Sequence, residues 1–102
     1  MITAEYAQEF LSLLKPFIAP LEQVRGDALD NNQIELVGAV ERFLSAYGHA
    51  AVITNSEHAT EAYAEVALSE LEEALENLTE VMQAYGVSTK LITRSQVVYT
   101  NA

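Results

Sequence analysis

The sequence predicts an all-α protein, a small antiparallel bundle of three main helices followed by an extended or β-like C-terminal arm. Two observations favour this fold class. Apolar residues recur at spacings of three and four over most of the chain before Gly86, as expected for amphipathic helices. After Gly86 the acids disappear and β-branched residues accumulate. We therefore expect a helical bundle domain over residues 1–86 and an arm over residues 87–102.

Length and composition set the limits within which this fold must form. A chain of 102 residues is long enough for one domain with its own core. Half of the residues are hydrophobic and a fifth are charged, which is typical of folded proteins and not of disordered acidic tails. Because the chain has no cysteine, neither disulfides nor thiolate metal sites are available, and packing must hold the fold together.

The first helix is indicated by apolar residues at helical spacing near the start of the chain. They are Tyr6, Phe10, Leu13, Leu14 and Phe17. Pro16 and Pro20 lack amide donors and disfavour a helical residue before them, so the helix should end or kink there. Leu21 and Val24 are expected to add one more turn before Gly26.

The second helix has a start signal in Asn32, which can cap it, and in Glu35, which can complete a capping box. It is expected to run to about Tyr47, with Gly48 as its C-terminal cap. Its buried stripe comprises Ile34, Val37, Val40, Leu44 and Tyr47. Gly38 within it favours close approach of another helix, the alternative being only a cost of about 1 kcal/mol.

The third helix is expected after a β-branched connector over residues 49–57, capped by Ser56 or Thr54 and closed after Tyr85 by Gly86. The apolar segment 50–54 is a candidate strand partner for the arm. The second half of the helix carries an a/d seam that calls for partner helices. The seam consists of Leu68, Leu71, Leu75, Leu78, Met82 and Tyr85.

Eight carboxylates lie between Glu57 and Glu80 without one Lys or Arg. At about 100° per residue, six of them fall on one arc opposite the seam, and only Glu70 flanks its far side. Like-charge pairs at i, i+4 such as Glu72/Glu76 each cost about 0.2–0.5 kcal/mol. A solvated face of an amphipathic helix would explain where the acids lie, but not why balancing lysines are missing.

The acidic residues of this helix and a net charge of −10 favour a non-catalytic interaction module. We expect it to bind a basic protein surface and to inhibit that partner. Eight charges over roughly 36 Å approach the charge spacing of a DNA strand, which suggests a nucleic-acid mimic that occupies a nucleic-acid-binding groove. The composition is similar to that of phage-encoded inhibitors and bacterial immunity or antitoxin proteins, a likeness of composition and not of motif. The expected partner-binding residues are Glu57, Glu61, Glu65, Glu72, Glu73, Glu76 and Glu80.

The alternative is an oligomeric structural or assembly protein that associates with itself through the seam and the arm. In that hypothesis the basic residues of the arm lie against the glutamates of a neighbouring subunit. The self-association residues are then Leu68, Leu71, Leu75, Leu78, Met82, Tyr85, Lys90, Arg94 and Tyr99. Tyr99 stands out because the bundle offers it no predicted core partner.

Other function classes find little support in the residues. No nucleophile motif or phosphate-binding glycine loop is present, so we expect no enzyme and no cofactor. His58 and Glu61 share a helical face at i, i+3, but a metal-binding bundle repeats such ligands on several helices, so we expect no metal site. No apolar run is long enough for a membrane span, and the charge disfavours direct binding to nucleic acid or anionic membranes. With no signal-peptide pattern, a cytoplasmic location is expected.

Overall fold

The structure is a computed structural model that describes residues 4–56 and 60–87, with side chains from residue 7 onward. These residues form four α-helices and one short 3-10 helix, with no strand among them. The elements are α1 (Ala4–Leu14), the 3-10 helix η1 (Lys15–Phe17), α2 (Ile18–Asp30), α3 (Ile34–Thr54) and α4 (Glu61–Ala84). The all-α prediction is therefore confirmed for this part of the chain. The predicted C-terminal arm over residues 87–102, apart from Val87, lies outside the described residues.

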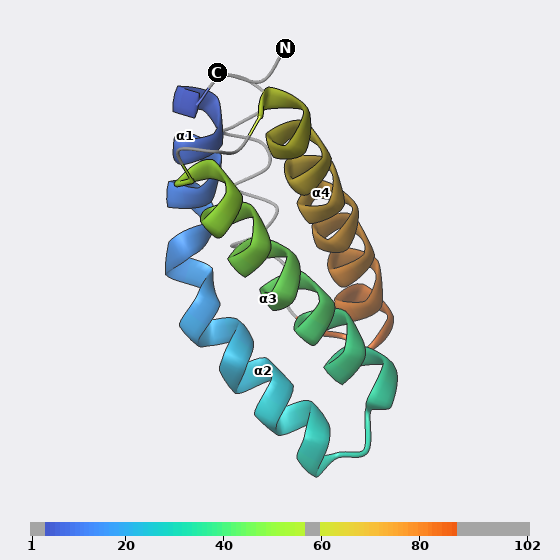
Figure 1. Cartoon of the computed structure of the whole chain (residues 1–102). Helices are drawn as coiled ribbons and strands as arrows, with labels where there is room; N and C mark the ends of the chain where they lie inside the picture. The colour runs from blue at the N-terminus through green and yellow to red at the C-terminus, as the bar shows by residue number, and fades with distance from the viewer. Residues whose placement is uncertain (1–3, 57–59, 88–102) are drawn as a thin grey trace.

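The helices are arranged as three arms that alternate in direction (Figure 1). α1, η1 and α2 follow one another end to end and make one bent arm. α3 returns beside this arm, and α4 runs back along the other side of α3. α3 packs most extensively against α4 and then against α2, so it is the central arm.

The two prolines mark the bend in the first arm, as the sequence predicts. Pro16 lies in η1, and Pro20 is the third residue of α2, where a backbone N–H has no acceptor within the helix in any case. The prediction that only one further turn follows was wrong, because α2 has 13 residues and Gly26 lies inside it. Leu21 and Ala28 are both buried, and their packing in the core stabilises the longer helix.

The boundary between α2 and α3 differs from the predicted capping box. Asn32 adopts a positive φ of 57° and ends α2. Its N–H donates to the Leu29 carbonyl at 3.2 Å, and the Gln33 N–H donates to the Ala28 carbonyl at 2.8 Å, which together form a Schellman motif. The N-cap of α3 is Gln33, without a side-chain cap. Asparagine tolerates the left-handed region better than other non-glycine residues, which explains its place here.

α3 continues past Gly48 to Thr54, so the predicted helix end and the predicted strand over residues 50–54 were both wrong. The reason is burial: Ala50 is fully buried and Ile53 packs against the core. The Tyr47 hydroxyl also donates to the Leu11 carbonyl at 3.4 Å, which joins α3 to α1 at this level. These contacts outweigh the β-branched composition of the segment.

Gly38 does not mark a close helix contact within the chain. It is exposed, and a Cβ added there would meet no atom within 4 Å. The predicted close approach was therefore wrong for the contacts inside this chain.

α4 begins at a different cap from the one predicted and ends where the sequence indicates. Thr60, and not Ser56 or Thr54, is its N-cap, and the Thr60 hydroxyl accepts a hydrogen bond from the Tyr63 N–H at 3.3 Å. At the other end Gly86 takes a positive φ of 73°, which closes the helix with a second Schellman motif.

The hydrophobic core lies between α3 and its two neighbouring arms. Phe43 at the middle of α3 is fully buried, and its ring lies 6.5 Å from that of Tyr47. α4 contributes the largest share of fully buried leucines. They are Leu68, Leu71, Leu75 and Leu78. The seam predicted for this helix therefore has its partner helix, α3, in the same chain.

Candidate protein-interaction surface

The acidic surface predicted from the sequence lies on α4. We use the term acidic face for six glutamates: Glu61, Glu65, Glu72, Glu73, Glu76 and Glu80. Five of them are exposed and Glu65 is half-buried. Glu57, the seventh predicted member, lies outside the described residues.

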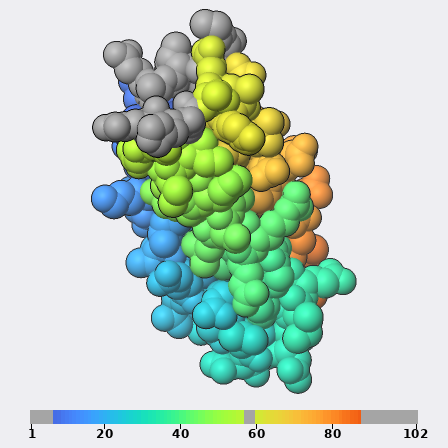
Figure 2. All heavy atoms as spheres, in the orientation of Figure 1, coloured from blue at the N-terminus to red at the C-terminus, as the bar shows by residue number. Residues whose placement is uncertain are grey.

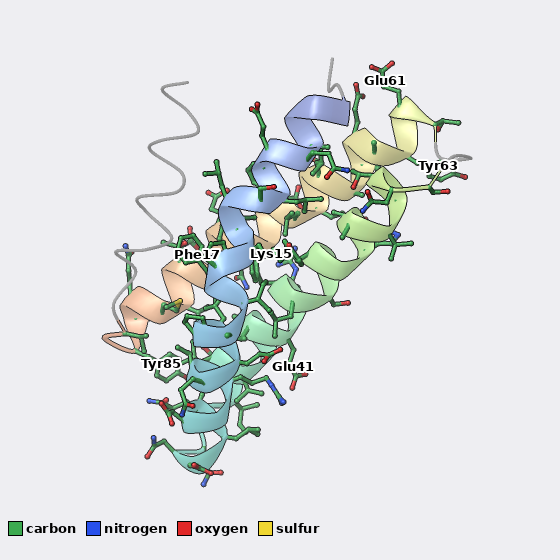
Figure 3. The ribbon with its side chains drawn as sticks, turned by 90° about the vertical axis from the view of Figure 1, so that its left-hand side faces the viewer. Lys15, Phe17, Glu41, Glu61, Tyr63 and Tyr85 are labelled. Carbon is green, nitrogen blue, oxygen red and sulfur yellow. The ribbon has the colours of Figure 1, made fainter. Side chains whose placement is uncertain are left out.

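The buried seam fixes the rotation of α4 and so decides which way the glutamates point. Leu71, Leu75 and Leu78 are turned into the core and are at most 2 % exposed. Residues on the opposite arc of a helix must then face solvent. Figure 3 shows Glu61 and Tyr63 at the start of α4 and Tyr85 just beyond its other end. Glu61 is the first helical residue, where a negative charge is favourable to the helix dipole.

Most of the acidic face has no neighbouring cation among the described residues. The ion pairs in this part of the chain are Arg42–Glu73 at 3.9 Å, His49–Glu70 at 3.8 Å and Arg25–Glu41 at 3.3 Å. Within the acidic face only Glu73 takes part in one of them. The exposed side chains of each pair mean that it contributes little to stability.

The remaining glutamates are arranged to repel one another. Glu72, Glu76 and Glu80 follow one another at intervals of one helical turn, and Glu61 and Glu65 form a further i, i+4 pair. Each like-charge pair destabilises an isolated helix by about 0.2–0.5 kcal/mol. The six charges span roughly 28 Å along the axis, about one per 5 Å, which is sparser than the one phosphate per roughly 3.4 Å of a DNA strand.

A shallow groove of about 460 Å³ lies between α3 and α4, on the side of α4 that carries Glu70. Its lining residues are Arg42, Ser45, Ala46, His49, Glu70 and Glu73. The α3 rim is therefore basic and the α4 rim acidic, with the Arg42–Glu73 and His49–Glu70 pairs across it.

Sequence reasoning missed this groove because it placed His49 outside regular structure. In the structure His49 lies within α3, seven residues after Arg42 and therefore on the same side of the helix. The signal that could have found the groove was this seven-residue spacing, together with Glu70 and Glu73 three residues apart on the facing helix.

The predicted self-association residues have several different environments. The buried members belong to the core of the single chain. They are Leu68, Leu71, Leu75, Leu78 and Met82. Tyr85 is 37 % exposed, and Lys90, Arg94 and Tyr99 lie outside the described residues.

Metal-ligating side chains do not gather in the part of the chain that the structure describes. No group of three His, Cys, Asp or Glu residues there is arranged to hold a metal ion. No buried side-chain nitrogen or oxygen in the described ranges lacks a hydrogen-bond partner. His58, the one candidate ligand that the sequence suggested beside Glu61, lies outside those ranges.

Among the described helices, none has both the length and the apolar character needed to cross a membrane. Comparison of the chain with protein-family models, with curated proteins and with solved structures found no match. Function must therefore be inferred from the surface itself.

Proposed function

We propose that this protein is a non-catalytic interaction module that presents the acidic face of α4 to a basic surface of another protein and inhibits that partner by covering the surface. The observation that carries the proposal is the run Glu72, Glu76 and Glu80, which repeats at one-turn intervals without a cation beside it in the described residues. A chain that gained nothing from these charges would lose helix stability by keeping them. A basic partner neutralises these charges, which relieves the repulsion among the glutamates and adds attraction between the two proteins.

The kind of partner follows from the geometry of the charges. The acidic face lies along one straight helix, so it fits an elongated basic groove better than a single basic loop. Nucleic-acid-binding grooves have this form and this charge. Occupation of such a groove is the specific mode of inhibition that we propose, and the lower charge density of the acidic face predicts weaker electrostatic attraction than that of DNA itself.

The test compares two triple variants with the same change in net charge. Glu72→Lys, Glu76→Lys and Glu80→Lys reverse the centre of the acidic face. The control replaces three exposed acids on the first arm, Glu9, Glu22 and Asp30, by Lys. Far-UV circular dichroism confirms that both variants fold. The protein is then immobilised and used to capture basic proteins at about 50 and 500 mM salt, followed by competition with duplex DNA.

The proposal requires a captured protein that is retained by wild type and by the control variant but not by the α4 variant. Its binding should weaken at least about tenfold at the higher salt concentration, because exposed charges are screened beyond a few ångströms there. Duplex DNA should displace it if the captured surface is a nucleic-acid-binding groove. Equal capture by both triple variants would show that the acidic face is not the binding surface.

A further inference from the structure

The outer side of α3 is a second candidate surface, distinct from the acidic face. α3 is the central arm, and Figure 2 shows its outer side, in green, running across the front of the molecule. Six exposed residues lie on this side at alternating spacings of four and three, the spacing of a helix-packing seam. We call them the α3 ridge: Ile34, Gly38, Glu41, Ser45, Gly48 and Val52.

Large apolar side chains stand at both ends of the α3 ridge. Ile34, which the sequence places in a buried stripe, is 67 % exposed, and Val52 is 70 % exposed, so none of the described residues covers either side chain to any large extent. They lie about 27 Å apart along the helix axis. Between them the ridge carries small residues, and a Cβ added at Gly38 or Gly48 would meet nothing within 4 Å. Packing inside the chain gives no reason for glycine at these helical positions, whereas close approach of another helix would.

The order of residues on the α3 ridge is self-complementary. If a second copy lies antiparallel across it, with a two-fold axis beside Phe43, Ile34 of one copy meets Val52 of the other. In the same register Gly38 meets Gly48 and Glu41 meets Ser45. Large residues thus meet large ones at the two ends. Glycines meet between those ends and the axis, where the missing side chains let the helix backbones stay close together. A two-fold interface requires this kind of self-complementary surface.

The charges beside the α3 ridge have the same symmetry. Glu35, Arg42 and His49 follow one another at seven-residue intervals on the flank that faces α4. The two-fold arrangement brings Glu35 of each copy to within two residues, about 3 Å along the axis, of the level of His49 of the other. It brings the two Arg42 side chains near the axis, where each already has Glu73 of its own chain at 3.9 Å. The two Arg42 and two Glu73 side chains near the axis therefore carry no net charge.

Charge balance also favours this face for self-contact. At a net charge of −10, two copies repel each other over most of their surfaces. The described part of the chain contains three Lys or Arg residues, and two of them, Arg25 and Arg42, lie beside the α3 ridge. Arg25 pairs with Glu41, a member of the ridge, at 3.3 Å. A basic partner would be repelled by these arginines, whereas a second copy presents the same arginines together with their paired Glu41 and Glu73.

From these observations we infer that the protein forms a two-fold dimer in which the α3 ridges of two copies pack antiparallel. One helix from each copy makes a contact at the small end of the range for specific interfaces, so the dimer is a weak one that forms at high micromolar concentration. The buried seam of α4 takes no part in it. The inference does not depend on the proposed function, because Glu72, Glu76 and Glu80 are exposed on α4 and belong neither to the α3 ridge nor to the groove lining.

The first experiment measures mass by sedimentation equilibrium from about 10 µM to about 1 mM, at low and high salt. Wild type should pass from a monomer of 11.2 kDa towards twice that mass, and high salt should leave the dimer unchanged or tighten it by screening the overall repulsion. This salt dependence is opposite to that expected for a basic partner on α4. A wild-type chain that stays monomeric at 1 mM would overturn the inference.

Glutamine substitutions separate the α3 ridge from general effects on folding. Gly38→Gln and Gly48→Gln place a bulky side chain in open space, so each should leave the monomer folded and raise the dissociation constant of the dimer by at least about tenfold. Gly26→Gln on α2 is the matched control, because a Cβ there also meets nothing within 4 Å and the site lies off the ridge. A dimer that tolerates both ridge substitutions, or that the control disrupts equally, would contradict the assignment.

Cysteine pairs test the register directly, since the chain has no cysteine of its own. A mixture of Ile34→Cys and Val52→Cys chains should form an intersubunit disulfide between unlike copies under mild oxidation. Each variant alone should stay largely uncrosslinked, because the antiparallel register keeps like positions far apart. Crosslinking of Ile34→Cys to itself at an equal rate would refute the antiparallel arrangement.

Discussion

Replacing the three helix-interior glycines by alanine provides a direct test of the fold. Gly26 lies within α2, and Gly38 and Gly48 lie within α3. At each of them an added Cβ meets no atom within 4 Å. The substitution therefore removes the entropic cost of glycine without introducing a clash.

The expected gain follows from helix propensity. Glycine is about 0.5–1 kcal/mol less favourable than alanine in a helix interior, so the triple variant should be about 1.5–3 kcal/mol more stable than wild type. The sites are ten or more residues apart in sequence and share no contact, so their effects should be nearly additive. For a domain of this size each kcal/mol raises the midpoint of thermal unfolding by about 4–8 °C.

Thermal unfolding followed by far-UV circular dichroism at about 5 µM measures this gain on the monomer. Gly86→Ala is the control, because Gly86 has a φ of +73° and alanine there should destabilise the chain by about 1 kcal/mol. Glycine-to-alanine substitution should therefore raise the unfolding midpoint at the helical sites and lower it at the left-handed site. If Gly26→Ala or Gly48→Ala lowered the midpoint, the helical assignment of these segments would be wrong.

Two other substitutions test the α2 end and the core. Asn32→Ser should lower the free energy of unfolding by about 1 kcal/mol while Asn32→Gly should not, because Asn32 has a positive φ. If Asn32 were an N-cap, serine would preserve stability. Urea unfolding of the two variants distinguishes these cases. Phe43→Ala should cost about 3–5 kcal/mol, because the ring is fully buried at the centre of α3. Leu29→Ala, at a site that is 48 % exposed, is the control in the same urea series and should lose much less stability. Equal losses of stability for the two variants would contradict the placement of Phe43 in the core.

The boundary errors show what local signals leave undecided. Gly48 and the β-branched segment after it resemble a helix end followed by a strand, and Asn32 resembles an N-cap. A local window does not contain the burial of Ala50 or the hydrogen bond from Tyr47 to Leu11, which join the end of α3 to the rest of the molecule. The preference of asparagine for both N-caps and left-handed caps likewise leaves its role open until the helix on each side is known.

The sequence by itself determined the all-α class, the bend at Pro16 and Pro20, and the division of α4 into a buried seam and an acidic face. These features follow from composition, from the chemistry of proline and from the period of a single helix, all of which are local. Only the tertiary structure decided that α3 is the central arm, that the seam packs within the chain, and that Arg42 and His49 face Glu73 and Glu70 across a groove. The α3 ridge belongs to this second group, because a residue is exposed or buried only once the other helices have taken their places.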